Sequence, residues 1–236
     1  MKKYFAEFLG TLLFVIISCG GIGAAQALMQ STGNEEVTLY VMMGAALSLL
    51  VGVGVLITHK LFKDISGAHL NPAVSLAMLV RGKLSLIDFI GYASSQLLAS
   101  VCGAGLLYLF FETGETIGAC GFEAANNIFV SSMWQAFAVE AFATFVFVLL
   151  FIKLSEKDCG SSSLIIGLSF SALFLLAFPF TGGCLNPARA FGPALICGGD
   201  AIEQLWLFVL APMLGAALAA GVNLAFNYVK KEKTEE

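Results

Sequence analysis

The tripeptide Asn-Pro-Ala stands at residues 71–73 of this chain and again at residues 186–188. Each copy begins an apolar piece, near 70–80 and 187–197, that is shorter than the about 20 residues a helix needs to cross a bilayer. Proline fits the first turn of a helix, and the asparagine before it is a favoured N-cap. Each copy therefore predicts a short helix, whose positive N-terminal end points at the membrane midplane.

The rest of the chain has the composition of a membrane protein. Of its 236 residues, 58% are hydrophobic and 12% are charged, and the mean hydropathy is +0.90, whereas a soluble domain carries about 25% charged residues. Most of the surface is therefore expected to face a lipid bilayer. Six predicted transmembrane helices cover residues 4–28, 38–59, 86–110, 131–154, 162–180 and 203–229.

Basic residues are distributed unevenly between the two sides that six crossings define. Eleven of the twelve Lys and Arg residues fall on the termini and loops of one side. The charged residues of the opposite loops are all acidic. By the positive-inside rule, that side and both termini are expected to be cytoplasmic. The expected location is a cell (plasma or inner) membrane. Arg189, the twelfth, follows the second Asn-Pro-Ala and has no place as a loop charge.

The two halves of the chain resemble each other. Residues 6–11 read AEFLGT and residues 139–144 read VEAFAT, and each half has three spans with one Asn-Pro-Ala after its second. Because three is odd, the halves have opposite orientations, which predicts an inverted three-plus-three repeat over about 1–115 and 131–229 within a single domain, 1–236. The fold class is all-α, with six transmembrane helices and two half-helices that meet at the midplane.

The meeting point predicts a pore for small neutral molecules. Asn71 and Asn186 would present amide donors to a water oxygen there, while the positive helix ends repel cations and oppose proton passage. A lone Asn-Pro-Ala often only caps a helix. Two in matching positions of an inverted repeat favour a channel, because non-helical backbone persists at membrane depth only where it is buried or lines a water-filled cavity.

Two stretches resemble the signatures of the aquaporin and glycerol-facilitator family: SGAHLNPAVS at 66–75 and GGCLNPARAFGP at 182–193. The resemblance covers the whole chain. It implies a homotetramer with one pore per subunit that passes water passively, and other small neutral solutes such as ammonia, hydrogen peroxide or small polyols, while excluding protons and ions. Ala190 and Ala194 stand where glycerol facilitators tend to carry Asp and Lys, so the second motif looks most like the branch that passes water, ammonia and peroxide.

The resemblance also implies a selectivity filter. Arg189 matches the family arginine at the narrowest point of the pore. Phe174, twelve residues before Asn186, stands where strict water channels have His and glycerol facilitators a small residue. Gly183 would offer a backbone carbonyl and little bulk.

The fourth filter position lies on the second span, and two matches place it differently. Matching residues 44–48 to the family gives Leu49, whereas counting twenty residues back from Asn71 gives Val51. The stretch 59–64 looks about two residues longer than usual, so Leu49 is preferred.

Two carboxylates and two imidazoles fall near the predicted pore. Glu7 and Glu140 lie inside predicted spans, where ionisable groups are rare and usually functional. A proton relay needs a chain of such groups, which the sequence lacks, so both are expected to accept hydrogen bonds from backbone N–H groups of the non-helical loops. His69 is a candidate to line the cytoplasmic side of the pore, and His59 is expected to be an interfacial loop residue.

Six cysteines are scattered without metal-binding spacing, so no metal and no cofactor is expected. Cys184, two residues before Asn186, is expected beside the pore, where bound mercuric ion would obstruct it. The other five cysteines fall on spans, on loops or in the second half-helix, away from the filter.

Other functional classes receive less support. An inverted-repeat secondary transporter of a small solute is the alternative, but it needs a coupling site, and the pore offers no acidic residue besides Glu7 and Glu140. No catalytic constellation or nucleotide loop supports an enzyme. With a net charge of −4 and twelve basic residues, nucleic acid is not an expected partner.

Overall fold

The computed structural model describes residues 1–32, 37–111, 117–123, 132–156 and 160–235, and these residues form helices, turns and irregular segments without a strand. Six of the described helices are long and apolar enough to cross a membrane. They are α1 (Lys2–Thr32), α2 (Val37–Ser66), α4 (Leu86–Phe111), α5 (Met133–Ser155), α6 (Ser162–Thr181) and α9 (Leu205–Glu235).

Two shorter helices begin at the two Asn-Pro-Ala tripeptides, as the sequence predicts. They are α3 (Pro72–Val80) and α7 (Pro187–Cys197), and the one-turn helix α8 (Gly199–Glu203) follows α7. The predicted all-α membrane fold with six spans and two short helices is confirmed. The bounds of the two repeats stay a prediction, since residues 115 and 131, where one repeat would end and the other begin, lie outside the described residues.

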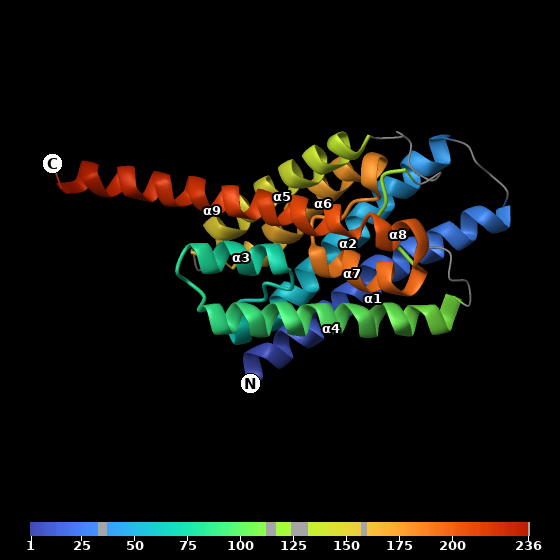
Figure 1. Ribbon diagram of the computed structural model, residues 1–236, viewed down its shortest axis with the longest axis horizontal. Helices are drawn as coiled ribbons and strands as arrows, with labels where there is room; N and C mark the ends of the chain where they lie inside the picture. The colour runs from blue at the N-terminus through green and yellow to red at the C-terminus, as the bar shows by residue number, and fades with distance from the viewer. Residues whose placement is uncertain (33–36, 112–116, 124–131, 157–159, 236) are drawn as a thin grey trace.

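The long helices run roughly side by side, and both termini lie toward the same end of the molecule, from which α9 projects (Figure 1). In the first half, α1 packs against α2 and α4, and in the second half α5 packs against α6 and α9. The contact between α2 and α6 joins the halves.

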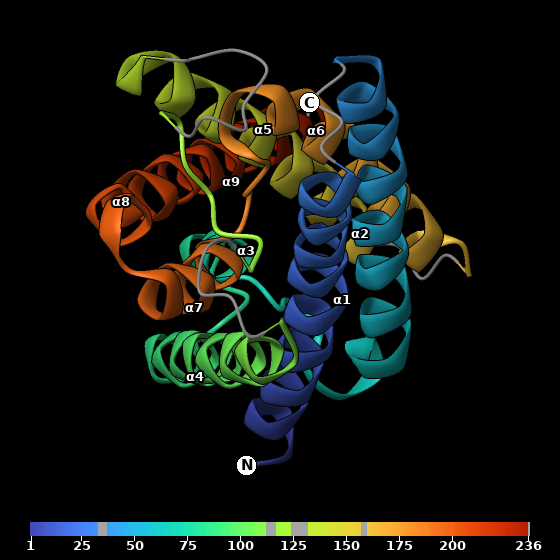
Figure 2. The ribbon, with the colours of Figure 1, turned by 90° about the vertical axis from the view of Figure 1, so that its right-hand side faces the viewer.

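The short helices cross between the halves. Although α3 belongs to the first half, it contacts α5 and α9 of the second as well as α4, and α7 of the second half contacts α4 and α1 of the first. Viewed along the bundle, α3 and α7 lie between α4 and α9 (Figure 2). Each half therefore completes the core of the other.

Close backbone approach at the helix crossings depends on small residues, as is usual in membranes. A Cβ on Gly52 of α2 would lie 2.6 Å from the carbonyl oxygen of Gly167 on α6, and a Cβ on Gly167 would lie 2.6 Å from that of Gly52. The obstacle on each side is backbone, which cannot move aside as a flexible side chain can. The joint between the halves therefore requires glycine at both positions.

We expect Gly167→Val to separate α2 from α6 and to lower the free energy of unfolding by about 1–3 kcal/mol, the usual cost of overpacking. The measurement is the thermal unfolding midpoint of the purified protein in mild detergent. Gly105→Val is the matched control, because a Cβ on Gly105 of α4 meets nothing within 4 Å. Equal midpoints for the two variants would contradict the tight crossing.

Candidate functional site

The two asparagines cap the helices that follow them. Asn71 is extended, with φ −158° and ψ 120°, and its side chain accepts a hydrogen bond from Ala73 N at 2.8 Å. Asn186 adopts nearly the same conformation and accepts from Ala188 N at 2.9 Å. This satisfies backbone donors of each first turn, which helix geometry leaves without an intrahelical partner.

The two amide groups also tie the halves together reciprocally. Asn71 Nδ2 donates to the carbonyl oxygen of Leu185 at 2.9 Å, and Asn186 Nδ2 donates to that of Leu70 at 2.9 Å. An amide nitrogen carries two hydrogens. One N–H of each asparagine is therefore bonded across the junction, and the second remains for whatever lies in the adjoining cavity, which both residues line.

The turns that lead into the two asparagines have a left-handed backbone. Leu70 has φ 52° and Leu185, its counterpart in the second half, has φ 57°. Such a conformation costs a residue with a Cβ roughly 1–2 kcal/mol. Something outside each turn must therefore hold it in place.

Glu7 of α1 holds the first turn. Its carboxylate accepts from the backbone N–H groups of His69 at 3.0 Å and Leu70 at 2.7 Å, and from the side chains of Ser66 at 2.6 Å and Gln96 at 2.7 Å. The side chain is fully buried. Four donors thus converge on one carboxylate that sequence reasoning assigned to loop support.

Glu140 of α5 holds the second turn in the same way. It accepts from the backbone N–H groups of Cys184 at 3.0 Å and Leu185 at 2.8 Å, and from the Thr181 hydroxyl at 2.6 Å. It too is fully buried. The inverted repeat therefore extends to individual hydrogen bonds.

A narrow cavity adjoins the asparagine pair on the α3 side of the junction. Its apolar wall comes mainly from α1, α2, α5 and α6 and includes four phenylalanine rings. His69 lines the cavity, and its place on the cytoplasmic side of a pore stays a prediction. The polar side chains around it are Thr58, His59, His69, Asn71 and Asn186.

The expectation that His59 lies in an interfacial loop is wrong. It is a residue of α2, is 5% exposed, and lines the cavity beside His69. The physical reason is the length of α2, which continues to Ser66 instead of ending near residue 59. The lysines that follow His59 made the segment look like a loop.

On the other side of the junction, three of the predicted filter residues lie close together. Arg189 of α7 is 1% exposed, and the ring of Phe174 packs over Gly183, since a Cβ on Gly183 would lie 2.7 Å from it. Cys120 joins them: its thiol contacts Arg189 Nη1 and lies 3.8 Å from the carbonyl oxygen of Gly183. Arg189 Nε has no hydrogen-bond partner within the described ranges.

The preference for Leu49 as the fourth member is wrong. Leu49 is 58% exposed and shares an outward face of α2 with Val53 and Ile57, whereas Val51 is fully buried in the same apolar cluster as Phe174. Two residues along a helix are about 200° apart, so the choice of register decides between lipid and interior. Because α2 runs unbroken to Ser66, the count back from Asn71 gives the correct face.

The cysteines are arranged differently from the expectation. Cys184 is fully buried, its thiol donates to the Asn186 carbonyl at 3.3 Å, and it packs among Leu207, Phe208 and other apolar residues. It therefore lies behind the segment that carries Gly183. The expectation that the other cysteines lie away from the filter is wrong, because Cys120 contacts Arg189; no motif surrounds Cys120 in the sequence, so nothing local pointed to it.

Comparison with known proteins gives one consistent result. The family model described as major intrinsic protein matches residues 1–223. A glycerol uptake facilitator protein-like 6 of Lactiplantibacillus plantarum is 33% identical over 227 residues, which cover 93% of this chain and 95% of that protein. An aquaporin Z of Rhodopseudomonas palustris is 34% identical over 230 residues, covering 92% and 90% of the two chains.

Among solved structures, the X-ray structure of the aquaglyceroporin from Plasmodium falciparum matches with a TM-score of 0.74 and 24% identity. The match covers 93% of each chain. At this identity the likeness concerns the fold, and it agrees with the arrangement of six long and two short helices.

We expect Glu140→Ala to destabilise the protein strongly, because it leaves the buried N–H groups of Cys184 and Leu185 without an acceptor. At about 1–3 kcal/mol for each such group, the free energy of unfolding should fall by roughly 2–6 kcal/mol. Thermal unfolding in detergent measures it, with the exposed Glu203→Ala as the control. Two variants with the same midpoint would show that the carboxylate does not hold the turn.

Proposed function

Because this chain belongs to the major intrinsic protein family, we propose that the principal solute of its channel is water, with tolerance for ammonia, hydrogen peroxide and small polyols. Members of this family are passive channels for water or small solutes, and they are not enzymes. The observation that carries the proposal is the asparagine pair: Asn71 and Asn186 each keep one amide N–H for the cavity at the point where two helix N-termini meet.

Protons would move poorly along a column of water molecules that this pair orients. The oxygen of a water molecule at the pair would accept from the two amides, so its hydrogens would point away from the junction in both directions. The positive ends of α3 and α7 add a barrier to cations, and Arg189 adds a full charge on the other side. We therefore propose that the channel excludes protons and ions.

The filter that we propose consists of Val51, Phe174, Gly183 and Arg189, with the thiol of Cys120 beside the arginine. It has one strongly polar corner and otherwise apolar walls. A water molecule needs few partners there, whereas a polyol needs several hydrogen bonds at once. This composition favours water and ammonia and makes polyols the slower solutes.

A coupled transporter is less well supported by the same contacts. Coupling to protons needs a titratable carboxylate that can change partners during transport. Glu7 and Glu140 instead each accept hydrogen bonds from two backbone N–H groups of the turns that they support. Their role is structural in this proposal.

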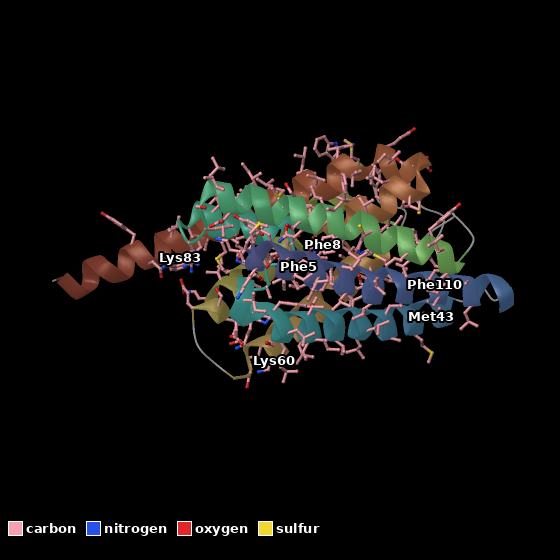
Figure 3. All side chains as sticks on the ribbon, turned by 90° about the horizontal axis from the view of Figure 1, so that it is seen from below. Phe5, Phe8, Met43, Lys60, Lys83 and Phe110 are labelled. Atoms are coloured by element: carbon pink, nitrogen blue, oxygen red, sulfur yellow. The ribbon has the colours of Figure 1, made fainter. Side chains whose placement is uncertain are left out.

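We further propose that both termini are cytoplasmic, in the cell membrane, and that the protein is a homotetramer. Lys60 and Lys83 lie toward the end from which α9 projects, whereas Met43 and Phe110 lie toward the other end (Figure 3). The positive-inside rule makes the lysine end cytoplasmic. The apolar outer faces of the long helices would meet lipid and neighbouring subunits.

We expect proteoliposomes that contain the protein to shrink in a sucrose gradient at least about tenfold faster than empty vesicles, with a barrier for water lowered by more than 1.4 kcal/mol. Stopped-flow light scattering measures this, and parallel runs with ammonia, urea and glycerol rank the solutes. Glycerol flux faster than water flux, or flux that follows an imposed ion gradient, would overturn the proposal.

In the same vesicles, Arg189→Val should keep water flux measurable but admit protons or small cations, because the charge at the filter is lost while the asparagine pair remains. A pH-sensitive dye inside the vesicles measures the leak. Arg81→Val is the control, because it also removes an arginine but at a position away from the filter. Arg81 lies at the C-terminal end of α3 and pairs with Glu156 at the end of α5. An Arg189→Val channel as tight to protons as the control would remove Arg189 from the filter.

We expect mercuric ion to inhibit water flux by binding the Cys120 thiol. A metal on that thiol would displace its contact with Arg189 in the narrowest region. Cys120→Ser should lose the sensitivity, whereas Cys184→Ser and the exposed Cys102→Ser should keep it. A thiol reductant should restore flux in the sensitive forms. Protection by Cys184→Ser and not by Cys120→Ser would contradict the placement of these two thiols.

A further inference from the structure

The cavity on the α3 side of the asparagine pair holds two imidazoles, one from a helix and one from a turn. We propose that His59 and His69 form a hydrogen-bonding site for ammonia and water in this half of the pore, and that His59 is a specificity-determining residue separate from the outer filter. The inference rests on the proposed channel function and names the solute class that this cavity favours.

His59 is held in a defined orientation. Its Nδ1 lies 2.9 Å from the hydroxyl of Ser163 in the first turn of α6, and its ring meets Phe151 edge-on, with centroids 5.7 Å apart. The residue is buried and lines the cavity. With Nδ1 engaged by serine, Nε2 is the ring nitrogen left for a solute.

His69 is also held by a serine and by aromatic rings, one of which is Phe151. Its Nδ1 lies 3.1 Å from the hydroxyl of Ser75 on α3, and its ring contacts Tyr92 at 5.1 Å and Phe151 at 6.1 Å between centroids. Both histidines therefore share one aromatic neighbour and have Nδ1 fixed by a serine. No hydrogen bond to either Nε2 is found in the described part of the chain.

The hydrogen bonds behind His69 favour one of its two neutral tautomers. Gln96 Nε2 donates one hydrogen to Glu7 at 2.7 Å and the other to the Ser75 hydroxyl at 3.1 Å. The Ser75 oxygen thus accepts from Gln96, and its own hydrogen is free to bond His69 Nδ1. With Nδ1 accepting from Ser75 in this arrangement, the neutral imidazole carries its proton on Nε2 and can donate it to a solute.

The remaining wall offers a solute little else. Thr58 also lines the cavity, but its hydroxyl donates to the Gly54 carbonyl at 2.8 Å within its own helix. The four phenylalanine rings and the aliphatic residues present apolar surface. A molecule that leaves the asparagine pair therefore crosses an apolar stretch in which the two Nε2 atoms are the main side-chain partners, because the Thr58 oxygen can only accept.

These partners suit a solute with a donor and an acceptor on one small atom. His69 can donate to the lone pair of ammonia or water, and His59 can accept an N–H or O–H when its proton is on Nδ1, bonded to Ser163. A polyol has several hydroxyls, and the apolar wall would leave most of them without partners. Two imidazoles thus favour ammonia and water over polyols.

The test is the permeability of reconstituted His59→Leu to water, ammonia and glycerol. Loss of one hydrogen bond in the permeation path corresponds to about a threefold fall, which we expect for water and ammonia but not for glycerol. His59→Gln, which keeps a donor and an acceptor, should recover at least half of the loss. Ser163→Ala should show a smaller fall, and Ser169→Ala on the same helix, whose hydroxyl donates to the Ile165 carbonyl within that helix, should show none.

Unchanged water and ammonia permeability in both His59→Leu and Ser163→Ala would overturn the inference, while leaving the channel intact. If His59→Leu does not assemble, Ser163→Ala against Ser169→Ala decides the question by the same criterion. A parent protein that does not conduct water would instead overturn the proposed function, so the two failures are distinct.

Discussion

Two buried carboxylates allow the chain to leave helical geometry in the middle of a membrane. Unbonded backbone N–H groups cost several kcal/mol each where no water is present, and the turns before the two asparagines expose such groups. Glu7 and Glu140 accept them, and each also binds a side-chain hydroxyl of its own turn. Without these acceptors, the left-handed turns at Leu70 and Leu185 would lose the hydrogen bonds to their backbone N–H groups.

The junction and its proposed selectivity follow from the turns. Once the turns are held, their carbonyls face the opposite half, where Asn71 and Asn186 bond them. The reciprocal bonds orient both amides and bring two helix N-termini together. In the proposed channel, a neutral molecule would find donors there, whereas a cation would meet two positive helix ends and Arg189. Selection against charge would thus arise from backbone geometry as much as from any side chain.

The features that the sequence predicted correctly depend on local chemistry or on the repeat. Asn-Pro-Ala caps a helix at both places where it occurs in this chain, and the matching positions of Glu7 and Glu140 in the two halves indicated a shared role. The errors concern quantities that local chemistry does not determine. The choice between Leu49 and Val51 depends on helical register, and therefore on where α2 ends. The charged residues that follow His59 made its segment resemble a loop in the sequence. The contact of Cys120 with Arg189 depends on how residues 117–123 pack against α7, for which the sequence carries no signal.

In the proposed channel, the asparagine pair presents two free amide N–H groups to the pore at the junction of α3 and α7. A high-resolution electron cryomicroscopy map of the protein in lipid nanodiscs would show whether it does. We expect an ordered water whose oxygen lies about 3 Å from Nδ2 of both Asn71 and Asn186, with continuous water density on either side. A dry junction, or amide nitrogens whose hydrogens are all bonded within the protein, would contradict it.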